Sequence, residues 1–362
     1  MNATTRLHAL GQRLWLDNIT RDLLDDGRLQ RYCAELSVSG LTSNPTIFEQ
    51  AIRNTGAYDE TIRRAAAAGK AGEAIFLDLD LADLRRAAAV FRPIHAASGG
   101  VDGLVSLEVS PLLADDAAAT VAEAKRLYAQ AQCANLLIKI PGTPAGVLAI
   151  EETIFAGVPV NVTLLFSREH YVAAADAYWR GIRRRVAAGL DPRVNSVASL
   201  FISRWDHALS GTLPSELNNR LGLAVAGQTY AAYRTRQTSA EWRRLADAGA
   251  RPQRLLWAST GTKDPRLPES YYAEALAAPD TIDTLPEKTL LALAAPGAQD
   301  TALRVMPEDG GDAERVLADC ARAGVDRAAL AARLQRDGAQ AFSRSWSGLL
   351  AEIAAKSGQA DA

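Results

Sequence analysis

The chain has 362 residues, of which 48% are hydrophobic and 23% charged, and its formal net charge is -2. A chain of this length can bury a large apolar core, and its near-neutral charge argues against a broad basic surface for nucleic acid or anionic membranes. No stretch approaches the ~20 apolar residues that span a bilayer, and residues 1–18 lack the apolar segment of a secretory signal. We therefore expect a cytoplasmic protein with no nucleic-acid or membrane partner.

Eight short apolar segments are predicted strands. Runs of this length and composition fit strands that are buried on both faces, as in a parallel sheet. The last of the eight segments has the weakest strand pattern. In chain order they cover residues 13–17, 36–42, 103–109, 135–140, 159–165, 194–201, 254–259 and 281–285.

The segments between the predicted strands have helical patterns. Helices are expected over residues 120–134, from Pro144 to Glu152, and from an N-capping Ser167 to about residue 188. Residues 75–80 also resemble a strand, but the pattern that continues to residue 90 favours a helix. Strands that alternate with helices indicate βαβ units and a parallel sheet.

We predict a single domain over residues 1–362, a (β/α)8 TIM barrel with additional C-terminal helices. The extra helices are expected within residues 311–353, packed over the barrel, and residues 356–362 are expected to fray. A doubly wound open sheet is the alternative. Against that alternative, the first strand is followed by neither GxGxxG nor GxxxxGK[ST], so the dinucleotide and P-loop motifs are missing.

Polar residues gather at one end of seven predicted strands. In an α/β barrel the C-terminal strand ends and the loops after them build the active site. One polar group in an apolar strand is usually a satisfied structural group. Seven strands that each deliver polar groups to one end instead predict a cavity for a polyhydroxylated anion. The set is Asp17, Thr42, Ser43, Asn44, Glu108, Lys139, Asn161, Thr163, Ser199, Arg204, Ser259 and Lys263.

Lys139 stands inside an apolar run, whereas most of the other lysines have polar or helical surroundings. An ordinary lysine amine is protonated at neutral pH, and burial disfavours the charged form. Schiff-base chemistry is the known use of such an amine. Two alternatives stay open: Lys139 and Glu108 as a structural ion pair, and Asp17 as a helix cap or loop ligand.

No metal site is predicted. The four histidines, His8, His95, His170 and His207, fall on predicted helices or near the terminus, and none stands at a strand end. The three cysteines are far apart and form no zinc-ligand spacing. A metal-dependent reaction is therefore not expected.

The strand-end residues belong to stretches that resemble the transaldolase family over essentially the whole chain. The pattern is closest to its longer-chain bacterial subfamily. Each stretch alone is weakly specific, but six in family order are strong. They are LWLDNIT (14–20), GLTSNPTIF (40–48), SLEVSP (106–111), NLLIKIPGT (135–143), NVTLLFS (161–167) and LWASTGTK (256–263).

The resemblance implies a transferase of the pentose phosphate pathway that moves a dihydroxyacetone unit between sugar phosphates. Lys139 is similar to the Schiff-base lysine, Asp17 to the acid/base, and Glu108 with Thr163 to the pair that holds a water. No organic or metal cofactor is implied, because the lysine imine is the electron sink. The positions similar to substrate-binding residues are Asn44, Asn161, Ser199, Arg204 and Ser259.

One departure concerns the phosphate site. Better-known transaldolases have an arginine two residues after the serine that matches Ser259, whereas this chain has Gly261 there and Lys263 two residues later. We expect Lys263 to be the second phosphate ligand; a solvated loop residue is the alternative. A fructose 6-phosphate aldolase and a non-catalytic sugar-phosphate sensor are competing functions. Family members often form homodimers, but no interface can be identified from the sequence.

Overall fold

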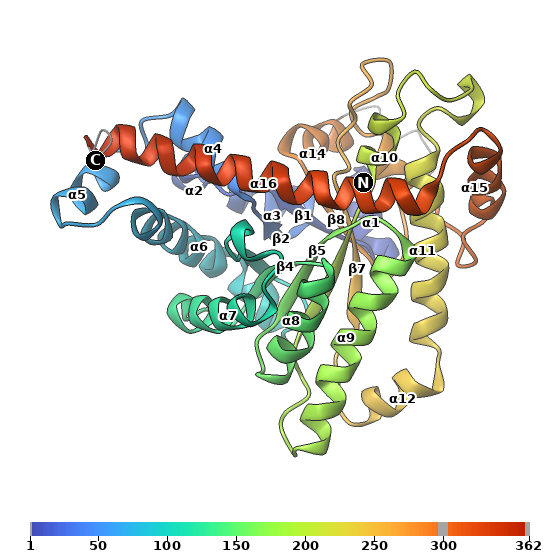
Figure 1. Cartoon of the computed structure of the whole chain (residues 1–362), viewed down its shortest axis with the longest axis horizontal. Coiled ribbons are helices and arrows are strands. Elements are labelled where there is room, and N and C mark those ends of the chain that lie inside the picture. The colour runs from blue at the N-terminus through green and yellow to red at the C-terminus, as the bar shows by residue number, and fades with distance from the viewer. Residues whose placement is uncertain (1, 296–302, 359–362) are drawn as a thin grey trace.

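The computed structural model describes residues 2–295 and 303–358, and its centre is an eight-stranded barrel (Figure 1). The strands are paired in sequence order, all parallel, and β8 pairs with β1. They are β1 (Arg13–Asp17), β2 (Val38–Thr42), β3 (Leu104–Glu108), β4 (Leu136–Pro141), β5 (Val160–Leu165), β6 (Ser196–Phe201), β7 (Gln253–Ala258) and β8 (Ile282–Leu285).

The closed barrel confirms the predicted (β/α)8 fold and excludes the open doubly wound sheet. Every predicted strand is present, with ends that differ by at most two residues. The largest differences are at the starts of β2 and β6. At β2 the reason is local, because Leu36 ends a helix and Ser37 caps it at a φ of 60°.

Helices surround the barrel and extend beyond it. They are α1 (Ala3–Leu10), α2 (Arg21–Asp25), α3 (Arg28–Leu36), α4 (Pro45–Asn54), α5 (Asp59–Ala67), α6 (Gly72–Ala97), α7 (Ala117–Ala131), α8 (Pro144–Phe155), α9 (Arg168–Ala187), α10 (Ser203–Ala208), α11 (Leu221–Gln237), α12 (Ala240–Asp247), α13 (Tyr271–Ala275), α14 (Glu287–Ala294), α15 (Ala313–Arg322) and α16 (Arg327–Ser357). Residues 75–80 lie in α6, as the longer pattern predicted.

Side-chain caps begin several helices directly after their strands. Asn44 accepts a hydrogen bond from the Ile47 N–H, Thr143 caps α8, and Ser167 caps α9. Proline follows the cap in α4 and α8, where its missing N–H costs nothing. The chain therefore turns sharply at the C-terminal end of the barrel and keeps the strand-end side chains close to one another.

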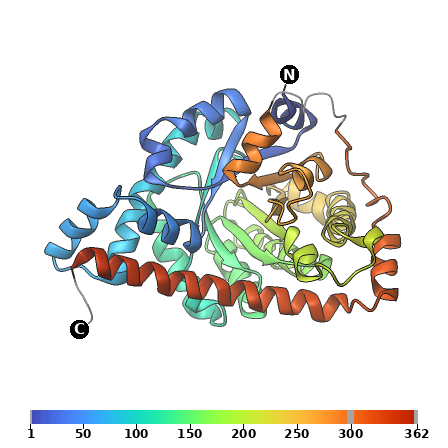
Figure 2. The ribbon, with the colours of Figure 1, turned by 90° about the horizontal axis from the view of Figure 1, so that it is seen from above.

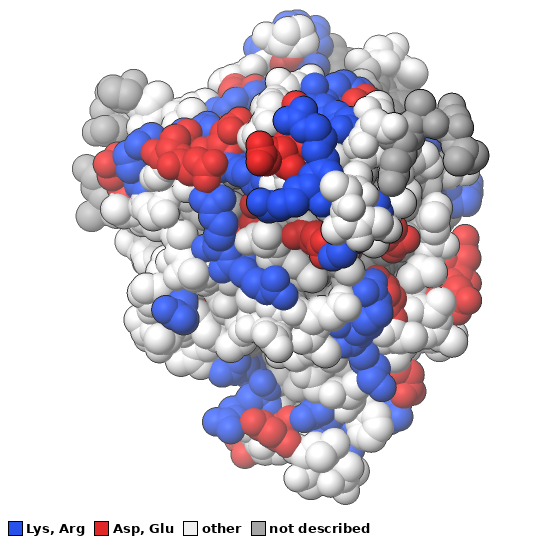
Figure 3. Space-filling model, turned by 90° about the vertical axis from the view of Figure 1, so that its left-hand side faces the viewer, with Lys and Arg blue, Asp and Glu red and all other residues white. Residues whose placement is uncertain are grey.

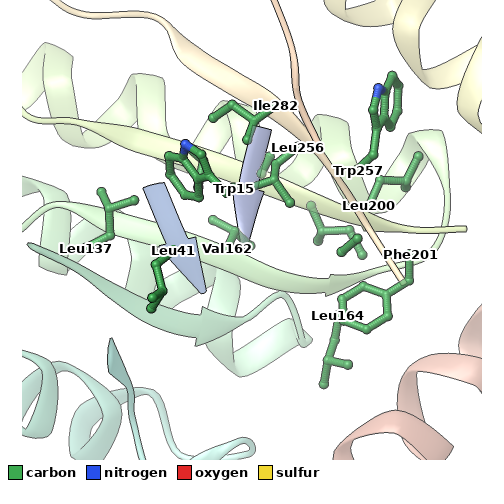
Figure 4. Close-up of a cluster of buried hydrophobic side chains, with 14 of the residues drawn as sticks. Trp15, Leu41, Leu137, Val162, Leu164, Leu200, Phe201, Leu256, Trp257 and Ile282 are labelled. Carbon is green, nitrogen blue, oxygen red and sulfur yellow. The ribbon is translucent and has the colours of Figure 1, made fainter. Parts of the chain in front are cut away.

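The N-terminal end of the barrel is closed by Trp15 and an ion cluster. Gly40 makes room for this indole, since a Cβ atom at Gly40 would lie 2.4 Å from Trp15 Nε1. Trp15 Nε1 donates to Asp102, which also pairs with Arg13 at 3.2 Å and lies 3.7 Å from Arg254. Figure 4 shows Trp15 among other buried apolar side chains of the barrel. Trp15 and this ion cluster therefore fill the N-terminal end of the barrel near β1.

The long helix α16 crosses the molecule over the barrel (Figures 1 and 2). Its contacts are with α4, α5, α6 and β5, and Trp346 packs edge-on against Phe76 with ring centroids 5.0 Å apart. The expected fraying from residue 356 is wrong for Lys356 and Ser357, which belong to α16. The Lys356 ammonium pairs with Asp59, which ties this end down, and residues 359–362 lie outside the described residues.

The surface carries charges of both signs. On the face shown in Figure 3, Lys and Arg side chains lie beside Asp and Glu side chains. Pairs such as Arg53–Glu352 and Arg86–Asp25 bring the two signs together. None of the described helices is long and apolar enough to cross a membrane.

The buried carboxyl group of Asp283 on β8 makes the free energy of unfolding depend on pH. Its side chain is fully buried, and within the described residues neither carboxyl oxygen has a hydrogen-bond partner. Burial raises the pKa of Asp283 to about 8. Between about pH 4 and this value the folded chain keeps a proton that the unfolded chain has lost. The free energy of unfolding therefore falls as pH rises through that window, by up to about 1.4 kcal/mol per pH unit.

We predict that Asp283→Asn removes this slope. The variant should gain stability relative to the parent as pH rises from about 4.5 to about 7.5, measured by urea unfolding. Asp115→Asn, which changes an exposed carboxylate, is the matched control and should show no such trend. A stability difference that is the same at both pH values would contradict the assignment.

Candidate active site

A cavity of about 310 Å³ opens at the C-terminal end of the barrel. Most of the predicted site residues line it, and α16 contributes one wall. The lining residues are Asp17, Thr42, Asn44, Thr46, Ile47, Lys139, Thr163, Ser199, Phe201, Arg204, Ala258, Ser259, Gly261, Lys263, Thr284, Pro286, Lys288 and Phe342. Glu108 and Asn161 lie behind this wall.

Lys139 is the buried cation at the base of the cavity, with 5% of its surface exposed. Its ammonium donates to the Ser43 carbonyl at 3.0 Å and lies 3.4 Å from Glu108 Oε2. The two residues are neighbours on adjacent strands, because β3 and β4 pair Glu108 with Lys139. The contact is long for a hydrogen bond. The amine therefore lies at the cavity wall and is only loosely held by its carboxylate.

Asp17 faces the same cavity from the end of β1. Burial raises the pKa of the Asp17 carboxyl, while the positive charge of Lys139 and a hydrogen bond from Thr42 oppose the rise. The Thr42 hydroxyl lies 2.9 Å from Asp17 Oδ1 and 2.6 Å from the Thr284 hydroxyl. The helix-cap alternative for Asp17 finds no support, since the side chain that caps α2 is Thr20.

Glu108, beside Lys139, and Thr163, which lines the same cavity, have free hydrogen-bonding capacity. Burial raises the pKa of the Glu108 carboxyl, and Lys139 lowers it by a smaller effect. Within the described residues, neither Glu108 Oε2 nor Thr163 Oγ1 has a hydrogen-bond partner, although both atoms are buried. Buried polar atoms without a protein partner favour positions where a water or a substrate group is bound.

Asn161 takes part in a hydrogen-bond chain across three strands. Its amide donates to the Ser106 hydroxyl at 3.1 Å and accepts from the Ser199 hydroxyl at 2.7 Å. Asn161 is fully buried and reaches the cavity only through Ser199. Asn44, in contrast, uses its carbonyl oxygen to cap α4 and lines the cavity directly.

Arg204 is a half-buried cation without a counter-ion. Its guanidinium lies 5.2 Å from the centroid of the Phe201 ring, and within residues 2–295 and 303–358 it has no hydrogen-bond or ion-pair acceptor. Burial accordingly lowers the pKa of Arg204. A partly buried guanidinium that faces a cavity and lacks a carboxylate is suited to an anionic ligand.

Two lysines add to the positive charge at the cavity mouth. Lys263, expected from its sequence position, is exposed and lines the cavity. Lys288, which sequence reasoning missed, also lines it and lies 3.2 Å from Glu269. Ser259 adopts a φ of 56° and its hydroxyl hydrogen-bonds to that of Ser203 at 3.1 Å. Lys288 comes three residues after the end of β8, and this spacing is the signal that could have found it.

Phe342 is the second residue that the sequence did not reveal. It belongs to α16, and its ring centroid lies 5.8 Å from Lys139 Nζ. Its position in an alanine-rich helix 203 residues after Lys139 gives no local sign of a role in the cavity. The ring shields the amine from solvent on the side that faces α16.

Comparisons with known proteins agree with this geometry. The family model described as Transaldolase/Fructose-6-phosphate aldolase matches residues 14–353. The chain belongs to the transaldolase/fructose-6-phosphate aldolase family. This confirms the resemblance seen in the strand-end stretches.

Three similar curated proteins are named transaldolase. One from Thiobacillus denitrificans is 44% identical, over 98% of this chain and the whole of the relative. One from Frankia alni is 42% identical, over 99% of this chain and 98% of the relative. One from Neisseria meningitidis is 40% identical, over 98% of this chain and the whole of the relative.

We predict that Thr42→Val raises the pKa of Asp17 further. The substitution removes a hydrogen bond that favours the carboxylate, and the hydroxyl is the only polar group lost. The carboxyl titration can be followed by 13C NMR. Thr284→Val is the control, because it leaves the Thr42–Asp17 hydrogen bond in place and should have the smaller effect. An unchanged or lower pKa in Thr42→Val would refute this account of the carboxyl.

Proposed function

We propose that this protein is a transaldolase, which transfers a dihydroxyacetone unit from a ketose phosphate to an aldose phosphate through a Schiff base on Lys139. The observation that carries the proposal is one buried lysine at a cavity wall, with Glu108 3.4 Å away and Asp17 facing the same cavity. A structural Lys139–Glu108 ion pair alone would not need an open cavity or a second carboxylate.

In the first step the unprotonated amine of Lys139 attacks the C2 carbonyl of a donor such as fructose 6-phosphate or sedoheptulose 7-phosphate. The carbinolamine that forms takes up a proton on its hydroxyl, loses water and becomes a protonated imine. Glu108 moves the protons of this step through a water that it shares with Thr163. Two observations support that role: both residues have a buried oxygen without a partner within the described residues, and Glu108 lies 3.4 Å from the amine while Thr163 lines the same cavity.

In the second step the Asp17 carboxylate removes the proton of the C4 hydroxyl. The C3–C4 bond breaks, its electrons enter the imine, and the aldose phosphate leaves. The enamine bound to Lys139 then attacks the aldehyde of glyceraldehyde 3-phosphate or erythrose 4-phosphate, and Asp17 returns the proton. Burial shifts the pKa of the Asp17 carboxyl towards neutral pH, and such a pKa favours proton transfer both from and to the substrate hydroxyl.

The remaining lining residues bind the substrate around these two steps. Asn44 and Ser199 hold the ketol hydroxyls, and Asn161 orients Ser199 through the 2.7 Å hydrogen bond. Arg204 binds the phosphate, with Lys263 and Lys288 at the rim as further cations and Ser259 as a neighbouring donor. The cytoplasmic location and the homodimer expected from the sequence stay predictions.

Borohydride trapping tests the nucleophile. Fructose 6-phosphate with borohydride should leave a three-carbon adduct on Lys139, located by peptide mass. Lys139→Ala should remain folded but show neither adduct nor turnover, whereas Lys125→Ala, an exposed lysine on α7, should behave as the parent. Turnover retained in Lys139→Ala would end the proposal. Free dihydroxyacetone, released equally with and without acceptor, would indicate an aldolase.

Arg204→Ala tests the anion site. Loss of charge-assisted hydrogen bonds should raise KM for fructose 6-phosphate by about ten- to hundredfold. The KM for dihydroxyacetone, a donor without phosphate, should change little. Arg266→Ala, which removes an exposed arginine paired with Asp264, is the control. Equal effects of Arg204→Ala on both donors would contradict phosphate binding at this residue.

A further inference from the structure

Three residues of α16 form one face of the helix, and one of them, Phe342, lines the cavity. Gln335, Gly338 and Phe342 are spaced by three and four residues, so they share one side of the helix. All three are buried. The Gln335 amide donates to the carbonyls of Gly142 and Leu164, both at 2.9 Å. Through these hydrogen bonds α16 is fixed to the ends of β4 and β5.

Gly338 is a residue of this face that lies next to Arg204. A Cβ atom at Gly338 would lie 3.2 Å from Arg204 Nη1 and 2.9 Å from Leu164 Cδ2. The distance to Arg204 is shorter than an ordinary van der Waals contact. The distance to Leu164 is so short that a side chain would have to move. With a side chain at this position the guanidinium would have to shift by a few tenths of an ångström, so the absence of a side chain at Gly338 gives the guanidinium its present room.

Of the groups next to Gly338, Leu164 and the backbone of α16 cannot easily move. Leu164 is 1% exposed, so its side chain has little free space around it. The Gln335 hydrogen bonds prevent α16 from lifting at this turn. Arg204, held by no acceptor within the described residues, is the group with the most freedom to move. A methyl group at position 338 would therefore displace the guanidinium.

We propose that Gly338 is a positioning residue that sets the specificity for phosphorylated substrates by reserving the space of the Arg204 guanidinium. The inference rests on the proposed role of Arg204 in phosphate binding. Glycine within a helix is less stable than alanine, so its presence here calls for close neighbours, and those neighbours are Leu164 and Arg204. The long C-terminal helix thereby becomes part of substrate recognition.

The test compares Gly338→Ala with the same substitution at Gly348, ten residues further along α16. At Gly348 a Cβ atom would meet only the flexible end of Glu49, away from the cavity. Gly338→Ala should raise KM for fructose 6-phosphate by roughly tenfold, the loss of about one charge-assisted hydrogen bond. In Gly338→Ala the KM for dihydroxyacetone should be nearly unchanged. In Gly348→Ala the KM values for both donors should be close to those of the parent. Inhibition by inorganic phosphate should weaken in parallel.

A double-mutant cycle with Arg204→Ala shows whether the effect passes through the guanidinium. In that background Gly338→Ala should cause no further rise in KM. If Arg204→Ala changes KM for the phosphorylated donor but Gly338→Ala does not, the inference is overturned and the proposed function stands. If Arg204→Ala has no phosphate-specific effect, the inference fails together with the proposed role of Arg204, whereas the Schiff-base chemistry is judged separately by borohydride trapping on Lys139. Should Gly338→Ala not fold, Leu164→Ala removes the 2.9 Å contact, and the same comparison is made in that background.

Discussion

The burial of one ammonium group beside two carboxylates governs the architecture of the site. Lys139, Glu108 and Asp17 stand on β4, β3 and β1, and the closed barrel holds all three at one end. Removal from water raises the pKa of both carboxyl groups, and the lysine charge opposes the rise in each. Such a set is costly to bury for structure alone. The strand pairing fixes the Glu108–Lys139 contact, so the chemistry depends on the barrel register and not on loop conformation.

A second charge, that of Arg204, lies on another part of the cavity and, unlike that of Lys139, has no carboxylate beside it among the described residues. It is partly buried, and no carboxylate of the described chain neutralises it. The site therefore has two separated electrostatic regions. Around Lys139 the charges are internally compensated and can exchange protons. At Arg204 the positive charge is unsatisfied and can select an anion. A sugar phosphate has this same division between a reactive ketol end and a charged end, which is why the two regions fit one substrate class.

The helix α16 links these regions to the rest of the fold. It packs on α4, α5 and α6 through contacts such as Trp346 with Phe76, and the same helix places Phe342 near the amine and Gly338 against the guanidinium. Because interiors are close-packed, a wall that is anchored outside the site can hold side chains within it to a few tenths of an ångström. Stability of the C-terminal segment and geometry of the cavity are therefore coupled.

The sequence by itself determined the barrel and most of the chemistry, because both are written in local patterns. Short apolar runs predict the strands, and the polar residues at or just after the ends of seven of them predict most residues of the cavity, from Asp17 to Lys263. What the sequence could not decide depends on contacts between distant segments. Only the tertiary structure shows that Asn161 bonds to Ser106 and Ser199 and lies behind the cavity wall, and that Lys356 continues a helix because Asp59 binds it. The same holds for Phe342, which lies near Lys139, and for Gly338, which lies next to Arg204. More than 130 residues of chain separate the members of each pair, so no local sequence pattern predicts these contacts.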